Sequence, residues 1–345
     1  MEQTTSKKQG ERIAWIDTAK GLCLFLVVFG HLLTIGTWQN LKTAIYSFHM
    51  PMYFILAGWL MKPKNQKFST FLKEKFFRIL LPAIVYLLVC LPLSIKLQID
   101  AGASTLKILE KTFYFKGRLH FNVPVWFLLA MFQVLVIAKI IRLEKYKTWG
   151  KFLTAFICFA LAYVFYNVYH FPYFGIDKAI LCLGFYSVGG GLCAVRAKIK
   201  SKDLVSFLAI ISTMLWLLFS ALMKQSPSLY GFKLDNFFYF ILTGIFGSIM
   251  WFKISSLLSG IKSLTKFGRN TLLILGSQYY WYYYVRMHAV SFGIAKTYIG
   301  NIVAVVFTLL SMIVYYYLTD PVNKYLPFLN GIWYKDKKKE KVVEK

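Results

Sequence analysis

The stretch DTAKGLCLFLVVFGH (residues 17–31) is an apolar run that also holds an acid, a lysine and a histidine. An ionisable side chain inside a bilayer costs about 3 kcal/mol even on lenient scales, so a residue kept there is a functional candidate. On a helix, the eleven steps from Lys20 to His31 turn the chain by about 20° and advance it by about 16 Å. Asp17 lies three residues before Lys20, where the two can form an ion pair. The stretch predicts a membrane helix with one polar face.

The composition of the whole chain agrees with a membrane location. The 345 residues are 58% hydrophobic and 16% charged, whereas ordinary soluble domains have about 25% charged residues. Apolar runs of about 20 residues, each able to cross a bilayer core, follow one another along the chain. We therefore predict an all-α integral membrane protein with a short segment at 1–13, one transmembrane domain at 14–320 and a basic tail at 321–345. Its ten predicted spans are 14–36, 43–61, 79–98, 124–141, 152–169, 177–195, 204–223, 236–252, 270–285 and 299–318.

The net charge of +27 is distributed unevenly between alternate loops. If residue 1 is cytoplasmic, the cytoplasmic segments hold 29 of the 41 lysines and arginines. This asymmetry follows the positive-inside rule and predicts a multi-pass protein of the plasma membrane with both termini in the cytoplasm. The basic tail KDKKKEK (335–341) then contacts anionic membrane lipid. We expect no nucleic-acid partner.

Two interpretations fit the polar face of the first helix. In the structural one, Asp17 and Lys20 lie at the membrane surface and His31 bonds a neighbouring helix. In the functional one, the residues serve chemistry, and Gly21 and Gly30 let another helix or a ligand come close beside them. The sequence has no G-x-S-x-G or H-E-x-x-H motif, and we expect no metal.

Five short motifs occur in an order that resembles the acyltransferase family 3 membrane proteins, which O-acylate sugars of bacterial envelope polymers. The family's basic residue, ten intervening residues and histidine fall on Lys20 and His31, and the W-I-D-x-A-K-G form resembles the branch related to fucose 4-O-acetylases. The commoner arginine at the first position would bind phosphate with two parallel bonds, which lysine does not offer. The motifs are WIDTAKGLCLFLVVFGH (15–31), FHMPMYFILAGWL (48–60), KEKFFRILLPAIVY (73–86), PVWFLLAMF (124–132) and KFGRNTLLILGSQ (266–278).

The resemblance implies transfer of an acetyl or other acyl group from cytoplasmic acetyl coenzyme A to a sugar hydroxyl of an envelope polysaccharide or exopolysaccharide. His31, kept neutral by burial, is the expected general base, on the same helix face as Lys20 and Asp17. Coenzyme A is polyanionic, so Lys20, Arg78 and Arg269 at the cytoplasmic face are its expected binding residues. We expect a lipid-linked or membrane-proximal glycan as the acceptor.

Three further residues are candidates for contact with the acceptor. His49 lies across a short outer loop from His31, although an interfacial histidine needs no function. Trp126 is a possible stacking platform for a sugar, with the interfacial aromatic belt as the favoured alternative. Gln278 occupies a position where many family members carry histidine. For the run YYWYYY (279–284), belt or helix packing is favoured over sugar binding.

A transporter or flippase of a lipid-linked or small sugar is the alternative function. In that case Asp17, Lys20 and His31 would form a proton path. The placement of these residues on one helix disfavours this reading, because alternating-access sites usually draw on broken helices from both halves of a transporter.

Overall fold

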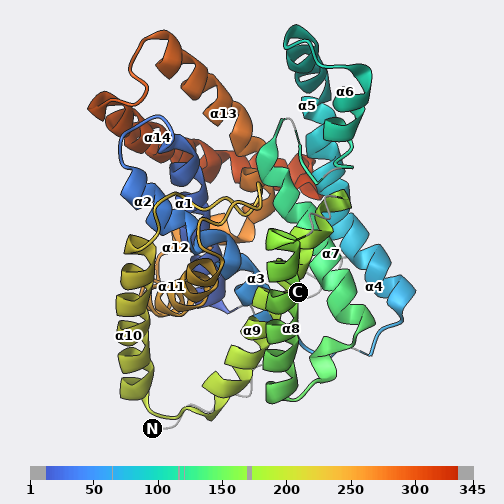
Figure 1. The fold of residues 1–345 in the computed structure, drawn as a ribbon, viewed down its shortest axis with the longest axis vertical. Coiled ribbons are helices and arrows are strands. Elements are labelled where there is room, and N and C mark those ends of the chain that lie inside the picture. Colours follow the sequence, from blue (N-terminus) through green and yellow to red (C-terminus); the bar gives the residue numbers. More distant parts are fainter. Residues whose placement is uncertain (1–12, 64, 116, 120, 169–172, 333–345) are drawn as a thin grey trace.

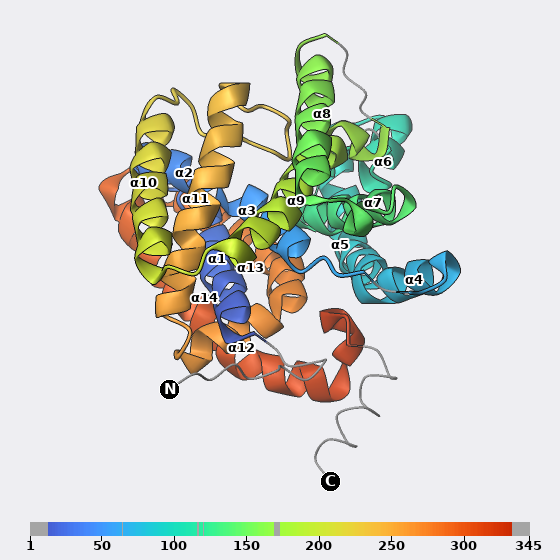
Figure 2. The same ribbon diagram turned by 90° about the horizontal axis from the view of Figure 1, so that it is seen from below.

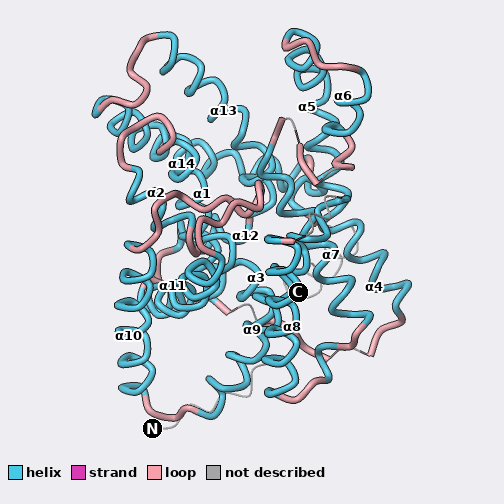
Figure 3. Tube along the Cα trace, viewed as in Figure 1, coloured by secondary structure: helices cyan, strands magenta, loops and turns pink. Residues whose placement is uncertain are grey.

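The computed structural model describes residues 13–63, 65–115, 117–119, 121–168 and 173–332. Within these ranges the chain is helical, with no strand beyond one isolated bridge between Ser228 and Lys233. Figure 3 shows helices joined by short loops. The α-helices are α1 (Ala14–Leu32), α2 (Gln39–Tyr46), α3 (His49–Trp59), α4 (Phe68–Lys75), α5 (Leu81–Asp100), α6 (Thr105–Thr112), α7 (Trp126–Ile140), α8 (Thr148–Asn167), α9 (Ile176–Lys198), α10 (Lys202–Ala221), α11 (Phe237–Leu257), α12 (Lys262–Arg269), α13 (Thr271–Ser291) and α14 (Tyr298–Tyr325).

Five short helical segments complete the chain. Four are single turns of 3-10 helix, and the fifth is a π-helical turn that makes α4 and α5 one continuous helical stretch. They are η1 (Phe76–Leu80, the π-helix), η2 (Val123–Val125), η3 (Leu143–Lys145), η4 (Tyr173–Gly175) and η5 (Pro327–Asn330). Residues 1–12 of the predicted segment 1–13 and the basic stretch 335–341 lie outside the described residues.

Helix α1 is the centre of the bundle. It packs against α3, α11, α12, α13 and α14, and Figure 2 shows it between α11 and α13. Most of its side chains are buried, among them Cys23, Leu24 and Val27. A second group, α3, α7, α8 and α9, packs beside it (Figure 1). The helix that carries Asp17, Lys20 and His31 is therefore surrounded by other helices.

Eight helical stretches of the described chain are long and apolar enough to cross a membrane. The prediction of an all-helical membrane protein is confirmed, whereas the count of ten spans is not. The helix α13 has 21 residues, but it is too polar to count among the eight. The eight are Ala14–Leu32, Phe68–Asp100, Val123–Ile140, Thr148–Asn167, Tyr173–Lys198, Lys202–Ala221, Phe237–Leu257 and Tyr298–Tyr325.

The predicted span 43–61 is not a single helix but two, α2 and α3, which meet at Ser47 and Phe48. Pro51 lies in the first turn of α3, where its missing N–H costs nothing and where it disfavours a helix running through from α2. The Thr243 hydroxyl, which donates to the Tyr239 carbonyl of its own helix at 2.8 Å, also lies 3.2 Å from the Ser47 carbonyl at the break. The break turns the chain beside His49.

Glycines allow the backbones of neighbouring helices to touch. A Cβ on Gly58 or Gly189 would overlap a backbone carbonyl of the facing helix in the α3–α9 contact, and a Cβ on Gly21 or Gly268 would do the same between α1 and α12. A Cβ on Gly30 would lie 2.8 Å from the Tyr46 ring, so the glycines beside Lys20 and His31 do admit neighbours.

The start of α1 and the end of α14 lie at the same end of the bundle. Gly268 of α12 packs on the Asp17 backbone, and Lys266 of α12 forms a 2.7 Å ion pair with Asp320 of α14. We call this the ion-pair end. The end that holds α2, the α6–η2 segment and the α10–α11 loop is called the cavity end.

Candidate functional site

Asp17 binds two cations at the ion-pair end. Its Oδ2 accepts from Arg269 Nε at 3.3 Å, and its Oδ1 lies 3.6 Å from Lys20 Nζ. Asp17 is buried, whereas Lys20 and Arg269 are partly open to solvent. The predicted Asp17–Lys20 pair is present. Arg269 of α12 is a third member of this group, and the sequence analysis had proposed it only as a coenzyme A ligand.

Arg78 joins this end through backbone contacts. It lies in the π-helical turn η1, a geometry that is frequent at functional sites, and its Nε is 3.7 Å from Glu74. The turn at η5 packs between the two arginines, because Gly331 lies against the Arg78 carbonyl and Asn330 donates to the Arg269 carbonyl at 3.3 Å. The four residues predicted for the cytoplasmic face thus lie at one end of the bundle.

His31 lies at the other end of α1 and lines a cavity of ≈ 180 Å³, called here the His31 cavity. The His31 Nδ1 and the Tyr46 hydroxyl share a hydrogen bond of 3.3 Å. The volume is below the range of about 300 to 1,000 Å³ that encloses drug-sized ligands, so it suits one ring or an acyl group. Lys20 does not line this cavity.

His49 faces the same cavity from the first turn of α3. Its Nδ1 donates to the Ile45 carbonyl at 2.8 Å, which leaves Nε2 as the acceptor nitrogen. The Tyr46 ring lies between the two histidines, 4.9 Å from the His49 ring and 6.3 Å from the His31 ring. The break between α2 and α3 therefore brings two imidazoles and a phenol to one cavity.

Trp126 forms another wall of the His31 cavity. Only 4% of it is exposed, and its ring packs against Tyr230 at 6.4 Å. The favoured expectation of an interfacial belt residue is wrong for Trp126, because a belt tryptophan has to reach the headgroups. The left-handed conformation of Asn122 and the 3-10 turn η2 direct the chain inward just before Trp126.

A chain of hydrogen bonds leads from α13 to the backbone of His31. Arg286 donates to the Tyr282 hydroxyl at 3.1 Å, Tyr282 lies 3.3 Å from the Thr34 hydroxyl, and Thr34 donates to the His31 carbonyl at 2.8 Å. The Tyr282 ring also contacts the His31 ring, at 5.6 Å between centroids. The YYWYYY run is therefore divided between roles, since Tyr282 is buried at the site while Trp281 and Tyr284 are exposed.

Gln278 does not line the His31 cavity with His49 and Trp126. It lines a second, very small cavity of ≈ 10 Å³ with His31, which holds about one water. Gln278 is only 4% exposed, and among the described residues neither its Oε1 nor its Nε2 has a hydrogen-bond partner. Buried amides are rarely left unpaired, so Gln278 has free hydrogen-bonding capacity beside His31.

The family model described as an acyltransferase domain (Acyl_transf_3) matches residues 13–320. The chain belongs to this acyltransferase family. No match was found among curated proteins or among solved structures.

Not every residue of the family-like motifs contributes to the cavity. In KFGRNTLLILGSQ, Asn270 accepts from Asn323 at 2.7 Å and from Asn330 at 2.6 Å. Its own amide donates to the Lys266 carbonyl at 2.7 Å. This asparagine cluster links α12, α14 and η5, and its polar groups hydrogen-bond within the protein.

The sequence analysis did not single out Tyr46, which lines the His31 cavity, or Tyr282, which contacts the His31 ring. Tyr46 lies fifteen residues after His31, and no regular spacing links residues across a helix break. Tyr282 could have been predicted from the sequence, because Gln278, Tyr282 and Arg286 are spaced four residues apart and so lie on one face of α13.

Proposed function

We propose that the protein transfers an acetyl or related acyl group from cytoplasmic acetyl coenzyme A to a hydroxyl of an envelope or exopolysaccharide sugar, with His31 as the general base. The observation that carries the proposal is the His31 cavity, where an imidazole held by Tyr46 faces His49 and Trp126. Family membership supports acyl transfer, and the cavity supplies a base in a confined space.

The reaction needs one proton acceptor and no redox partner. His31 takes the proton of the sugar hydroxyl as its oxygen attacks the thioester carbonyl. The tetrahedral intermediate then expels the coenzyme A thiolate, which receives the proton from His31. The products are the sugar ester and free coenzyme A, and His31 returns to its neutral form.

The acyl donor is placed by the residues of the ion-pair end. Lys20, Arg78 and Arg269 supply cations for its phosphates, while the pantetheine arm extends about 16 Å along α1 toward His31. Leu24 lies on the line between Lys20 and His31 and is fully buried. Entry of the arm along that line therefore requires the neighbouring helices to move.

The acceptor sugar occupies the His31 cavity in this proposal. Trp126 offers an apolar face to the sugar ring, and the acceptor nitrogen of His49 accepts a hydrogen bond from a second hydroxyl of the sugar. Gln278 stays a predicted substrate-binding residue, but its cavity has no room for a sugar, so its contact would run through a bound water.

The paired state of Asp17 favours the enzyme over the transporter. A proton path needs groups that can exchange protons along its length, whereas Asp17 is held by two cations. Leu24 and Val27, which follow Lys20 on the same face of α1, are buried and apolar.

The test is the O-acetyl content of envelope and secreted glycans, measured by NMR before and after mild base. Cells would express wild type, His31→Ala or the control His288→Ala at matched membrane levels. His288 is exposed on α13 and does not line the His31 cavity. We expect a base-labile acetyl signal in wild type and His288→Ala and its loss in His31→Ala. An unchanged signal in His31→Ala would contradict the proposal.

A further inference from the structure

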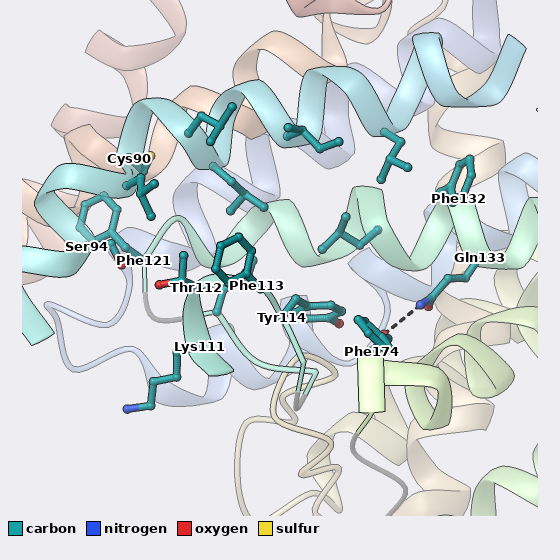
Figure 4. Close-up of a pocket in the computed structure, with 17 residues that line it drawn as sticks. Cys90, Ser94, Lys111, Thr112, Phe113, Tyr114, Phe121, Phe132, Gln133 and Phe174 are labelled. Atoms are coloured by element: carbon teal, nitrogen blue, oxygen red, sulfur yellow. Dashed lines mark hydrogen bonds between the residues drawn. The ribbon is translucent and has the colours of Figure 1, made fainter. Parts of the chain in front are cut away.

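An apolar groove lies between α5, the α6–η2 segment and α7, and has a volume of ≈ 390 Å³. Figure 4 shows Cys90 and Ser94 of α5 facing Thr112, Phe113 and Tyr114, with Phe132 and Gln133 on α7. Its walls are mostly aliphatic and aromatic, and Leu88, one of them, is 58% exposed. Since both α5 and α7 belong to membrane-crossing stretches, the groove opens toward lipid.

Three buried polar atoms of residues that line this groove lack a partner among the described residues. They are the Thr112 hydroxyl, the Tyr114 hydroxyl and the Gln133 Oε1. None of the three is open to the groove, and the Tyr114 hydroxyl lies against Gly175, just before α9. The surface that the groove presents to an occupant is therefore mainly apolar.

A single layer of residues separates the groove from the His31 cavity. Leu119 lines the groove and Tyr230 lines the cavity, and the Tyr230 hydroxyl accepts from Leu119 N at 2.8 Å while donating to Leu119 O. Burial raises the pKa of Tyr230 to about 12, so this hydroxyl stays protonated. The buried Lys178 lies over the rings of both Tyr114 and Tyr230 and donates to the Gly117 carbonyl.

The rim of the groove is basic on the side where the positive-inside rule expects few cations. Lys107, Lys111 and Arg118 lie in the predicted outer segment 99–123, and Lys111 lines the groove. Helix α6 has no buried residue, so its lysines do not serve packing. An anionic group at this rim accounts for them.

We propose that the groove binds the hydrocarbon chain of a phosphate-linked lipid whose sugar enters the adjacent His31 cavity, with Lys111 at the phosphate. The proposal rests on the proposed function for the identity of the sugar site and goes beyond it by assigning a lipid site. The chain fills the aliphatic part of the groove, and the phosphate contacts Lys111. The glycan then has to cross only the Leu119–Tyr230 layer.

Binding is measured by native mass spectrometry of the purified full chain with a long-chain polyprenyl phosphate, the matching polyprenol and phosphatidylglycerol. Leu88→Trp fills the groove, and Val89→Trp is its control, because Val89 is the adjacent residue, is 64% exposed and does not line the groove. Lys111→Gln removes the rim cation, and Lys224→Gln is its control, because Lys224 is an exposed cation that does not line the groove.

We expect Leu88→Trp to weaken polyprenyl phosphate binding about tenfold relative to Val89→Trp, and Lys111→Gln to weaken it about tenfold with little effect on polyprenol. Equal binding by each variant and its control would overturn the proposal, as would equal competition by phosphatidylglycerol, which would mean that the groove holds bulk lipid only. His31→Ala should bind the probe like wild type while losing transfer. If the groove variants bind the probe like their controls while transfer still depends on His31, the lipid site is rejected and the proposed function stands.

Discussion

At the ion-pair end of α1, Asp17 bonds two cations and the facing backbones touch, whereas at the cavity end His31 shares one hydrogen bond with Tyr46 and faces two cavities. Both ends belong to the same buried helix and carry family-like residues. At the ion-pair end the polar groups bond to one another, so substitutions there should act mainly on stability or on donor binding. The second leaves hydrogen-bonding capacity for a ligand, so changes there should act on catalysis.

The glycines of the two ends offer the sharpest contrast. A methyl group on Gly268 meets the Asp17 backbone, which cannot move aside, so Gly268→Ala should lower the free energy of unfolding by about 1 to 3 kcal/mol. Gly30→Ala meets only the edge of the Tyr46 ring and should cost less stability while reducing transfer. Both changes gain similar helix propensity, which cancels in the comparison. Thermal unfolding in one detergent measures the difference, and a larger loss in Gly30→Ala would contradict it.

Lys20→Ala tests the donor role of the ion-pair end. Loss of one phosphate contact should weaken coenzyme A binding about tenfold, as measured by calorimetry with purified protein. Lys262→Ala, which removes an exposed cation at the start of α12, is the control. Unchanged affinity in Lys20→Ala would remove Lys20 from the donor site.

Tyr46→Phe tests whether the hydroxyl holds the His31 ring. Loss of this hydrogen bond should lower kcat about fivefold and alter the pH–rate profile, with the unfolding temperature unchanged. The exposed Tyr317 offers a matched Tyr→Phe control. A change in stability without a change in kcat would make Tyr46 a packing residue.

Trp126→Phe should have the smallest effect. A phenyl ring keeps most of the apolar wall but stacks over less of a sugar, so KM for the acceptor should rise about threefold while KM for the donor stays constant. Steady-state kinetics with the acceptor identified by NMR measures both. An equal rise in both constants would point to a general disturbance of the fold.

The sequence predicted the helical membrane class because apolar runs are local features. It also predicted the Asp17–Lys20 pair and the shared face of Lys20 and His31, since both follow from helix geometry. The break at Ser47 was missed because 43–61 is mostly apolar. The stop comes from Pro51, which disfavours a helix running through from α2. Trp126 was misjudged for a related reason, since its burial depends on the Asn122 turn and on Tyr230, which is distant in sequence.

The most direct test compares His31→Ala and Asp17→Asn in the same membranes, with O-acetyl transfer per folded molecule and the unfolding temperature as paired readouts. We predict that His31→Ala loses transfer by about a hundredfold or more and keeps its unfolding temperature. Asp17→Asn should lose about 1 to 2 kcal/mol of stability and retain most of its transfer per folded molecule at saturating donor. Transfer that persists in His31→Ala would contradict the assignment of the chemistry to the cavity end.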